Sequence, residues 1–210
     1  MTSEDTYPRI EKVFSAKTTE RSAAMGRLAG KVIDDLVLKD LSLEQAECFF
    51  EHIEENRESY TDTIPFVSRT RTAAAMGELI ARNLKKQADG EAEFYTLWDK
   101  DRMAGYFLIR EKDKEAGWAE IGYMIGKEWR GKGITKKICD LLLEELFVQQ
   151  AMQKVVICCN DDNFASIGMA KKLGFRLEGN LRNHFVVNGK VRNMLYFGLL
   201  KEEWGGILEP

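Results

Sequence analysis

The feature that most constrains the fold is a short glycine-containing loop between two strongly patterned segments. Residues 118–125 alternate like a strand, and residues 134–147 carry apolar side chains at helical spacing. Between them lies the loop Trp-Arg-Gly-Lys-Gly-Ile-Thr, residues 129–135. The first turn of a helix has unpaired N–H groups and the positive end of the helix dipole, and two glycines let the backbone approach a bulky anion. The loop therefore predicts a phosphate site between strand and helix.

Composition favours one ordinary domain. The chain has 210 residues, of which 44% are hydrophobic and 31% charged, as is typical of a globular α/β domain. No apolar run approaches the ~20 residues of a membrane helix, and the start shows no signal pattern. We therefore expect a cytoplasmic protein without a membrane partner. The net charge of -3 argues against a nucleic-acid partner.

Cysteine and histidine give no sign of a metal site. Cys48, Cys139 and the adjacent Cys158 and Cys159 lack the spacing of metal ligands, so we expect reduced thiols in or near the core. The two histidines, His52 and His184, are too few for a histidine-rich metal site and make a histidine-based triad implausible. We expect no bound metal.

Alternation and helical periodicity divide most of the chain into strands and helices. A capping-box pattern, Ser42 with Gln45, starts the first core helix, which a polar loop, residues 56–72, is expected to follow. Asn188-Gly189 predicts a hairpin turn. Strand 118–125, the helix that follows and strand 155–159 form a βαβ unit with a right-handed crossover. Residues 1–33 lack sustained periodicity and are expected to be an N-terminal arm. The other predicted strands are 36–41, 93–98, 103–110, 176–187 and 191–200, and the helices after the first are 73–87, 134–149 and 163–173.

Motifs before and after the loop indicate the kind of protein to which it belongs. Ala-Glu-Ile-Gly-Tyr-Met-Ile, residues 119–125, precedes it, and Asn-Phe-Ala-Ser-Ile, residues 163–167, and Lys-Leu-Gly-Phe, residues 172–175, follow the next strand. In order and spacing, this set resembles the GNAT acetyltransferases. It is most similar to the RimJ/RimL-like branch, which acetylates ribosomal-protein N-termini. The resemblance covers residues 35–204, roughly, and leaves the first thirty or so outside.

The resemblance implies the fold and the acetyl donor. The fold would be an α/β (α+β) GNAT domain, with a mixed, mostly antiparallel sheet that is flanked by helices and splayed between its fourth and fifth strands, 118–125 and 155–159. The chain would form a single such domain. The donor would be acetyl-CoA, with its pantetheine arm along Met124 and Ile125 and near Asn163. Its pyrophosphate would rest on the amides of Arg130, Gly131, Lys132, Gly133, Ile134 and Thr135.

Two residues are the candidates for catalysis. A protein N-terminal amine has a pKa near 8 and needs a base, for which Glu120 is the candidate. The other interpretation of Glu120 is an ion-paired structural carboxylate. The serine of the family's N-x-x-S pattern, Ser166, would supply or relay a proton to the leaving thiolate, and its alternative role is a hydrogen bond to the helix backbone. A backbone N–H near Met124 would stabilise the charged carbonyl oxygen.

Two positions depart from the superfamily pattern. Glu128 stands where its phosphate motif usually has Gln or Arg, although the RimJ/RimL-like branch often has an acidic residue there. Ala170 stands where many members have a tyrosine that protonates the thiolate, so a tyrosine at that site is excluded.

The acceptor is the least constrained part of the prediction. By analogy with the family, Arg69, Arg71 and the hairpin that carries His184 would flank the acceptor channel, the arginines holding an acidic tail. His184 is otherwise an ordinary surface residue. The predicted acceptor is a protein N-terminal amine, and the alternatives are a polyamine, an amino acid or an aminoglycoside. A non-catalytic acetyl-CoA sensor and a homodimer are also compatible with the sequence.

Overall fold

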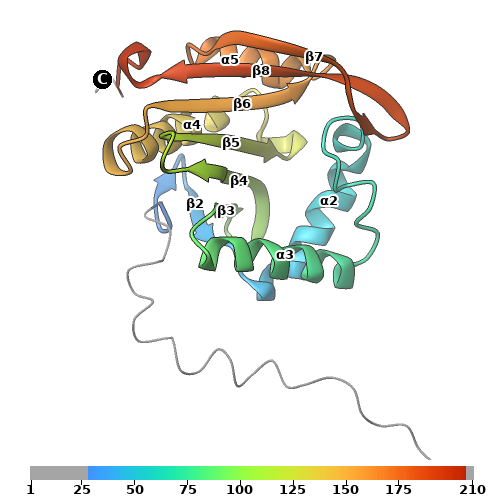
Figure 1. The fold of residues 1–210 in the computed structure, drawn as a ribbon. Coiled ribbons are helices and arrows are strands. Elements are labelled where there is room, and N and C mark those ends of the chain that lie inside the picture. The colour runs from blue at the N-terminus through green and yellow to red at the C-terminus, as the bar shows by residue number, and fades with distance from the viewer. Residues whose placement is uncertain (1–27, 207–210) are drawn as a thin grey trace, which may run out of the picture.

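Eight strands form one sheet in the computed structural model, which describes residues 28–206 (Figure 1). Their spatial order is β1-β2-β3-β4-β5-β6-β8-β7, and every neighbouring pair is antiparallel except β5 and β6, which are parallel. This confirms the predicted mixed, mostly antiparallel sheet. The strands are β1 (Val32–Ile33), β2 (Leu36–Asp40), β3 (Glu93–Asp99), β4 (Arg102–Asp113), β5 (Trp118–Ile125), β6 (Lys154–Asn160), β7 (Arg176–Val187) and β8 (Lys190–Leu200).

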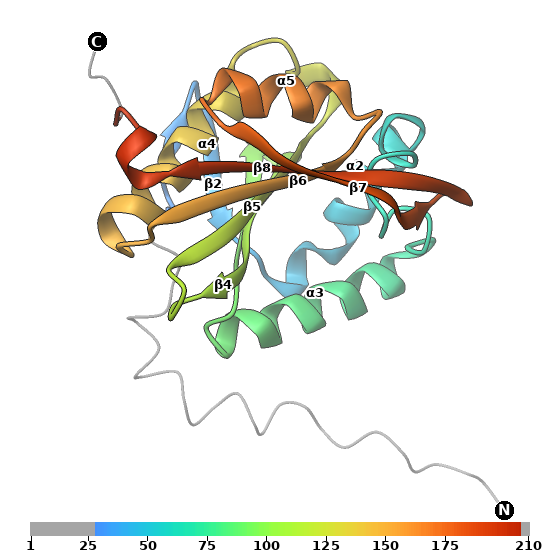
Figure 2. The same ribbon diagram turned by 45° about the horizontal axis from the view of Figure 1, so that its top comes forward.

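Helices cover both faces of this sheet and divide the core in two. One apolar cluster lies between the sheet and α4 and α5, and the other between the sheet and α2 and α3 (Figures 1 and 2). Among residues 28–206, no helix is long and apolar enough to span a membrane. The helices are η2 (Leu43–Gln45), α2 (Ala46–Tyr60), α3 (Ala73–Ala88), η3 (Lys127–Trp129), α4 (Ile134–Glu144), the π-helical η4 (Glu145–Gln149), α5 (Phe164–Lys172) and η5 (Lys201–Glu203).

Two boundaries differ most from the sequence prediction. Helix α2 extends past Asn56, where a loop was expected, to Tyr60, because both side chains are buried on its inner face. At the other boundary, residues 28–33 pack onto the sheet rather than form an arm: Leu28 and Ile33 are buried, and β1 pairs with β2. Residues 1–27, the rest of the predicted arm, lie outside the described residues.

The parallel strands separate part of the way along their length, as predicted. Pairing between β5 and β6 runs from Trp118 opposite Lys154 to Glu120 opposite Val156 and then stops. Beyond this point β5 continues to Ile125 and stays paired with β4 throughout. The splay therefore begins at Glu120.

Contacts at the end of β5 hold that strand against β4 and α2. The N–H of Gly126 donates to the carbonyl of Ala104 at 2.9 Å, and the N–H of Lys127 donates to Asn56 Oδ1 of α2 at 2.8 Å. A Cβ atom at Gly126 would stand 3.0 Å from both His52 of α2 and Trp129, so only glycine fits without a shift. These contacts hold β5 on the side away from β6.

The close packing of β4 on β5 gives a stability prediction. A Cβ atom at Gly105 would lie 2.7 Å from the carbonyl oxygen of Met124, and backbone cannot easily yield. We expect Gly105→Ala to lower the free energy of unfolding by about 1–3 kcal/mol, as overpacking does. The matched control is Gly168→Ala in α5, where the added methyl meets open space and should be neutral or stabilising. Urea unfolding of both variants tests this, and equal effects would contradict it.

Candidate active site

A cavity of about 530 Å³ opens where β5 and β6 separate. It extends from β3 and β4, across the gap, to the first turn of α5, and the α2–α3 connection closes one side with residues 63–66. Its walls include Phe66, Tyr106, Glu120, Met124, Cys158 and Ser166. The cavity therefore brings together the predicted catalytic residues Glu120 and Ser166.

The Glu120 carboxylate is buried in the wall of this cavity and paired with an arginine. Glu120 is only 5% exposed, and Arg110, its neighbour across the β4–β5 ladder, donates a hydrogen bond to it. Burial raises the pKa of Glu120 above its usual value, and the nearby Arg110 guanidinium only partly offsets this. Glu120 thus fits both interpretations, because it is ion-paired and it also faces the cavity.

Ser166 lies in the first turn of α5 with its hydroxyl uncommitted to the helix. The side chain of Asn163 caps the helix and accepts a hydrogen bond from the Ser166 N–H at 3.1 Å. No hydrogen bond in the described part of the chain joins the Ser166 hydroxyl to a backbone carbonyl, so the alternative role is not observed. Asn163 and Ser166 both line the cavity.

The phase of the β4–β5 ladder determines which backbone groups face the gap. Since Gly126 hydrogen-bonds to Ala104, antiparallel alternation directs the N–H and C=O of Met124 toward β4 as well. The intervening residues, Tyr123 and Ile125, direct theirs toward the gap that β6 leaves open. The donor expected near Met124 is thus on its two neighbours rather than on Met124 itself.

The loop before α4 presents a row of unpaired amides. Gly131 and Gly133 have φ values of +75° and +78°, and Gly133 is the N-cap of α4. Within residues 28–206, no hydrogen bond engages the N–H groups of residues 131–136, whereas the N–H of Arg130, which was also expected to hold the pyrophosphate, donates to the Lys127 carbonyl at 3.4 Å. Such an array at a helix N-terminus suits an anion. None of the six predicted loop residues, 130–135, lines the cavity itself.

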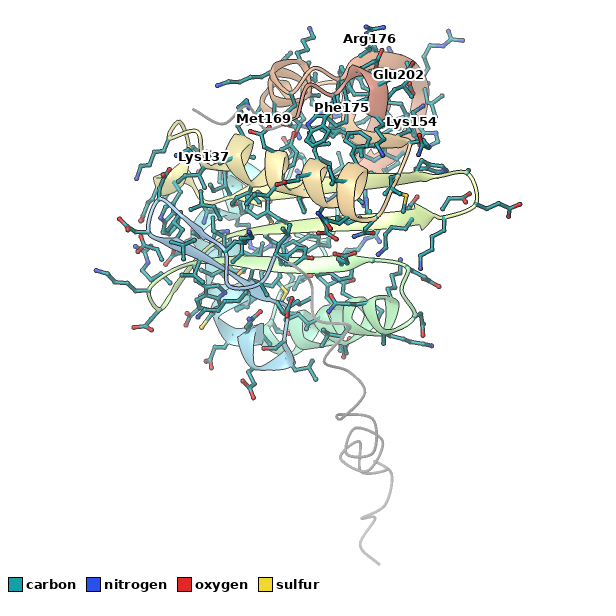
Figure 3. All side chains as sticks on the ribbon, turned by 90° about the vertical axis from the view of Figure 1, so that its left-hand side faces the viewer. Lys137, Lys154, Met169, Phe175, Arg176 and Glu202 are labelled. Carbon is teal, nitrogen blue, oxygen red and sulfur yellow. The ribbon has the colours of Figure 1, made fainter. Side chains whose placement is uncertain are left out.

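Two side chains tie this loop and the start of α4 to neighbouring elements. Arg130 turns back from the amides, donating to the carbonyl of Ile125 at 3.1 Å and to Ser59 Oγ of α2 at 2.9 Å, and lies over the Tyr60 ring. Lys137, which Figure 3 labels, lies on the first turns of α4. It pairs with Asp34 of the β1–β2 turn at 2.6 Å. The loop is therefore held in place while its amides stay open.

Three predicted acceptor residues do not line the cavity. Arg69 and Arg71 are exposed on the α2–α3 connection, and Arg71 donates to the Ser68 carbonyl at 3.0 Å. His184 is exposed on β7, in a separate shallow hollow that it shares with Arg182. The structure therefore does not bring these three together with Glu120.

The sequence analysis missed three residues of the site. Arg110 could have been found from its register opposite Glu120, once the hairpin between the two strands was aligned. Tyr123 and Cys158 lie in apolar runs and gave no signal of their own.

Across residues 28–206, no cluster of His, Cys, Asp and Glu side chains is placed to hold a metal ion.

Comparison with known proteins identifies the family. The profile of the acetyltransferase (GNAT) domain matches residues 35–176. A Bacillus subtilis (strain 168) protein that is named as a ribosomal N-acetyltransferase, YdaF, is 31% identical over 178 residues, which is 84% of this chain and 97% of that protein.

Solved structures share the fold at lower identity. The microcin C7 self-immunity acetyltransferase MccE, in complex with acetyl-CoA and AMP, superposes with a TM-score of 0.77 at 23% identity, covering 85% of this chain and 99% of that one. The ribosomal L7/L12 alpha-N-protein acetyltransferase RimL, in complex with coenzyme A, gives a TM-score of 0.76 at 19% identity, with 81% and 97% covered.

The buried carboxylate makes stability depend on pH. Because the pKa of Glu120 is higher in the folded protein than in the unfolded chain, the protonated carboxyl contributes to the free energy of unfolding. This contribution is fully present below the usual pKa of 4.5 and is lost as the pH rises through the pKa of the folded state. Glu120→Gln removes this titration. The free energy of unfolding of this variant, relative to that of the wild type, should therefore increase as the pH rises above 4.5. The increase is about 1.4 kcal/mol for each pH unit by which the pKa of Glu120 is raised on folding. Unfolding at pH 4.5 and pH 8 measures this.

The exposed Glu115 provides the control for this experiment. Glu115→Gln, in the β4–β5 turn, removes one carboxylate charge at an exposed position and therefore controls for the change in net charge. A Glu120→Gln variant that loses stability relative to the wild type as pH rises would show that the Arg110 pair outweighs burial.

Proposed function

The chain belongs to the GNAT acetyltransferases, and we propose that it transfers the acetyl group of acetyl-CoA to the α-amine of a protein N-terminus. The observation that carries this proposal is the placement of Glu120. A carboxylate with a raised pKa faces a cavity at the point where the β5 backbone loses its partner strand. A base therefore lies beside backbone donors, as amine acylation requires.

Each residue would have one role in a direct attack within a ternary complex. Glu120 takes the proton of the amine, directly or through water, as the nitrogen bonds to the thioester carbon. The N–H groups of Tyr123 and Ile125 both face the gap, and one of them donates to the carbonyl oxygen as it gains charge. When the carbon–sulfur bond breaks, its electron pair stays on sulfur, which takes a proton from or through the Ser166 hydroxyl. The products are the acetylated amine and the free thiol.

The open loop amides support acetyl-CoA as the donor. The unpaired amides of residues 131–135 would hold the pyrophosphate, since the loop is fixed from behind by Arg130 and leaves open space at both glycines. The pantetheine arm would then follow Met124 and Ile125 to Asn163, on the way to the cavity. Acetyl-CoA in the complex of the structural neighbour MccE agrees with this assignment.

The acceptor side supports a peptide terminus. The α2–α3 connection contributes apolar Ile64 and Phe66 to the cavity, and the exposed Arg69 and Arg71 follow on the same connection. We propose that the cavity takes the first residues of the acceptor, while these arginines and His184 contact residues further along it. The relative named as a ribosomal N-acetyltransferase, aligned over almost its whole length, supports a protein acceptor.

A thiol-release assay across N-terminal peptides and small amines tests the acceptor. We expect peptides with a free α-amine to be acetylated, and N-blocked peptides to be inert. Glu120→Gln should lower kcat by at least about 100-fold, as loss of a general base does, while coenzyme binding is retained. Turnover only with polyamines, amino acids or aminoglycosides would move the acceptor to that class. A wild type that releases no thiol with any acceptor would point to a sensor.

A glycine substitution tests the phosphate site. Alanine at Gly133 is strained at a φ of +78° and would re-orient the amides, so we expect the affinity for coenzyme A to fall about tenfold, the equivalent of one good hydrogen bond. Gly30→Ala is the matched control, because Gly30 has a φ of +85° and equally open surroundings outside the loop. Both variants should lose similar stability, and calorimetry with coenzyme A should show weaker binding only for Gly133→Ala.

A further inference from the structure

The Tyr123 hydroxyl is buried and has no hydrogen-bond partner among the described residues. Buried polar groups are almost always paired, because an unpaired one loses its hydrogen bonds to water without replacement. Replacing this tyrosine by phenylalanine would remove the cost and keep the ring. An unpaired hydroxyl beside the cavity therefore calls for a partner that arrives with the ligand, or for a role in the reaction.

The position of Tyr123 indicates what that role is. Strand alternation directs its ring to the face opposite Glu120, toward α4 and α5, where it packs against the core. Ser166 is the residue whose side chain interacts with the Tyr123 hydroxyl, although no hydrogen bond of normal geometry joins them, and Cys139 and Cys159 belong to the same core cluster. Burial raises the pKa of Tyr123 far above its usual value, and the interaction with Ser166 offsets this only in part. The phenol therefore stays protonated and can donate a hydrogen bond without giving up its proton.

We propose that Tyr123 is a positioning residue for Ser166. When coenzyme is bound, the Tyr123 hydroxyl donates to Ser166 Oγ, which directs the Ser166 proton at the leaving sulfur. This inference rests on the proposed function in one respect, which is the role of Ser166 as the residue that gives or relays a proton to the leaving sulfur. It explains why a hydroxyl is kept where it has no partner in the absence of ligand, and why a hydroxyl pair can act without the family's usual tyrosine at position 170.

The proton balance requires no change of charge at Tyr123. As the carbon–sulfur bond breaks, sulfur keeps the electron pair and takes the proton of Ser166, which is replaced from water in the cavity. Glu120 returns the proton of the amine to solvent. Tyr123 strengthens the donor character of Ser166, since hydrogen bonds in a chain polarise one another.

A double-mutant cycle tests the pairing. We expect Tyr123→Phe to lower kcat about tenfold, the equivalent of one hydrogen bond, with little change in KM. In a Ser166→Ala background the same change should alter kcat by less than about twofold, because the effects of substitutions at two interacting residues are not additive. The melting temperature of Tyr123→Phe should hold or rise, since no hydrogen bond is lost on substitution. Additive losses, or a fall in kcat matched by a fall in melting temperature, would overturn the proposal.

A binding experiment gives a second readout that needs no acceptor. The wild type should bind coenzyme A several-fold more tightly than desulfo-coenzyme A, which lacks the sulfur, and Tyr123→Phe should lose most of this difference. An unchanged difference in Tyr123→Phe would overturn the inference. Because the acceptor takes no part, a wrong proposal for the acceptor would leave this result intact.

Discussion

The separation of β5 from β6 is the constraint on which the rest of the structure depends. A parallel pair that stayed together to its end would use every backbone group of β5, and no gap would exist. Here the hydrogen bonds at Gly126 and Lys127 hold the end of β5 to β4 and α2, while the pairing with β6 stops at Glu120. The cavity and the unpaired amides of Tyr123 and Ile125 follow from this one divergence, and Glu120 lies where it begins.

The splay also separates the chemistry into two sides of the sheet. Glu120 and Met124 face α2 and α3, where the α2–α3 connection forms the wall of the proposed acceptor site. Tyr123 and Ile125 face α4 and α5, which carry the loop amides and Ser166 of the proposed donor site. Under the proposed mechanism, alternation along a single strand would thus place the base and the leaving-group residues on opposite sides of the reacting carbon. Arg110 limits the cost of burying Glu120 without removing the rise in its pKa.

Local patterns predicted much of this arrangement, and tertiary contacts decided the rest. The alternation of residues 118–125, the Ser42–Gln45 capping box and the Asn188-Gly189 turn all form as expected, because each depends on neighbouring residues. The extension of α2 to Tyr60 and the burial of Leu28 depend on packing against distant strands, which no local pattern contains. In the site, Glu120 and Ser166 were found from motifs. Whether the backbone groups of Met124 or those of its neighbours face the gap depends on which residues of β5 hydrogen-bond to β4. This is known only once the two strands are paired.

Amide hydrogen exchange, resolved by residue, tests the central claim most directly. If β5 is open toward β6, the amides of Tyr123 and Ile125 exchange rapidly in the free protein and become protected when coenzyme A is added, whereas Met124, paired with β4, is protected in both states. Slow exchange at Tyr123 and Ile125 without ligand, or no change on adding coenzyme A, would contradict the account.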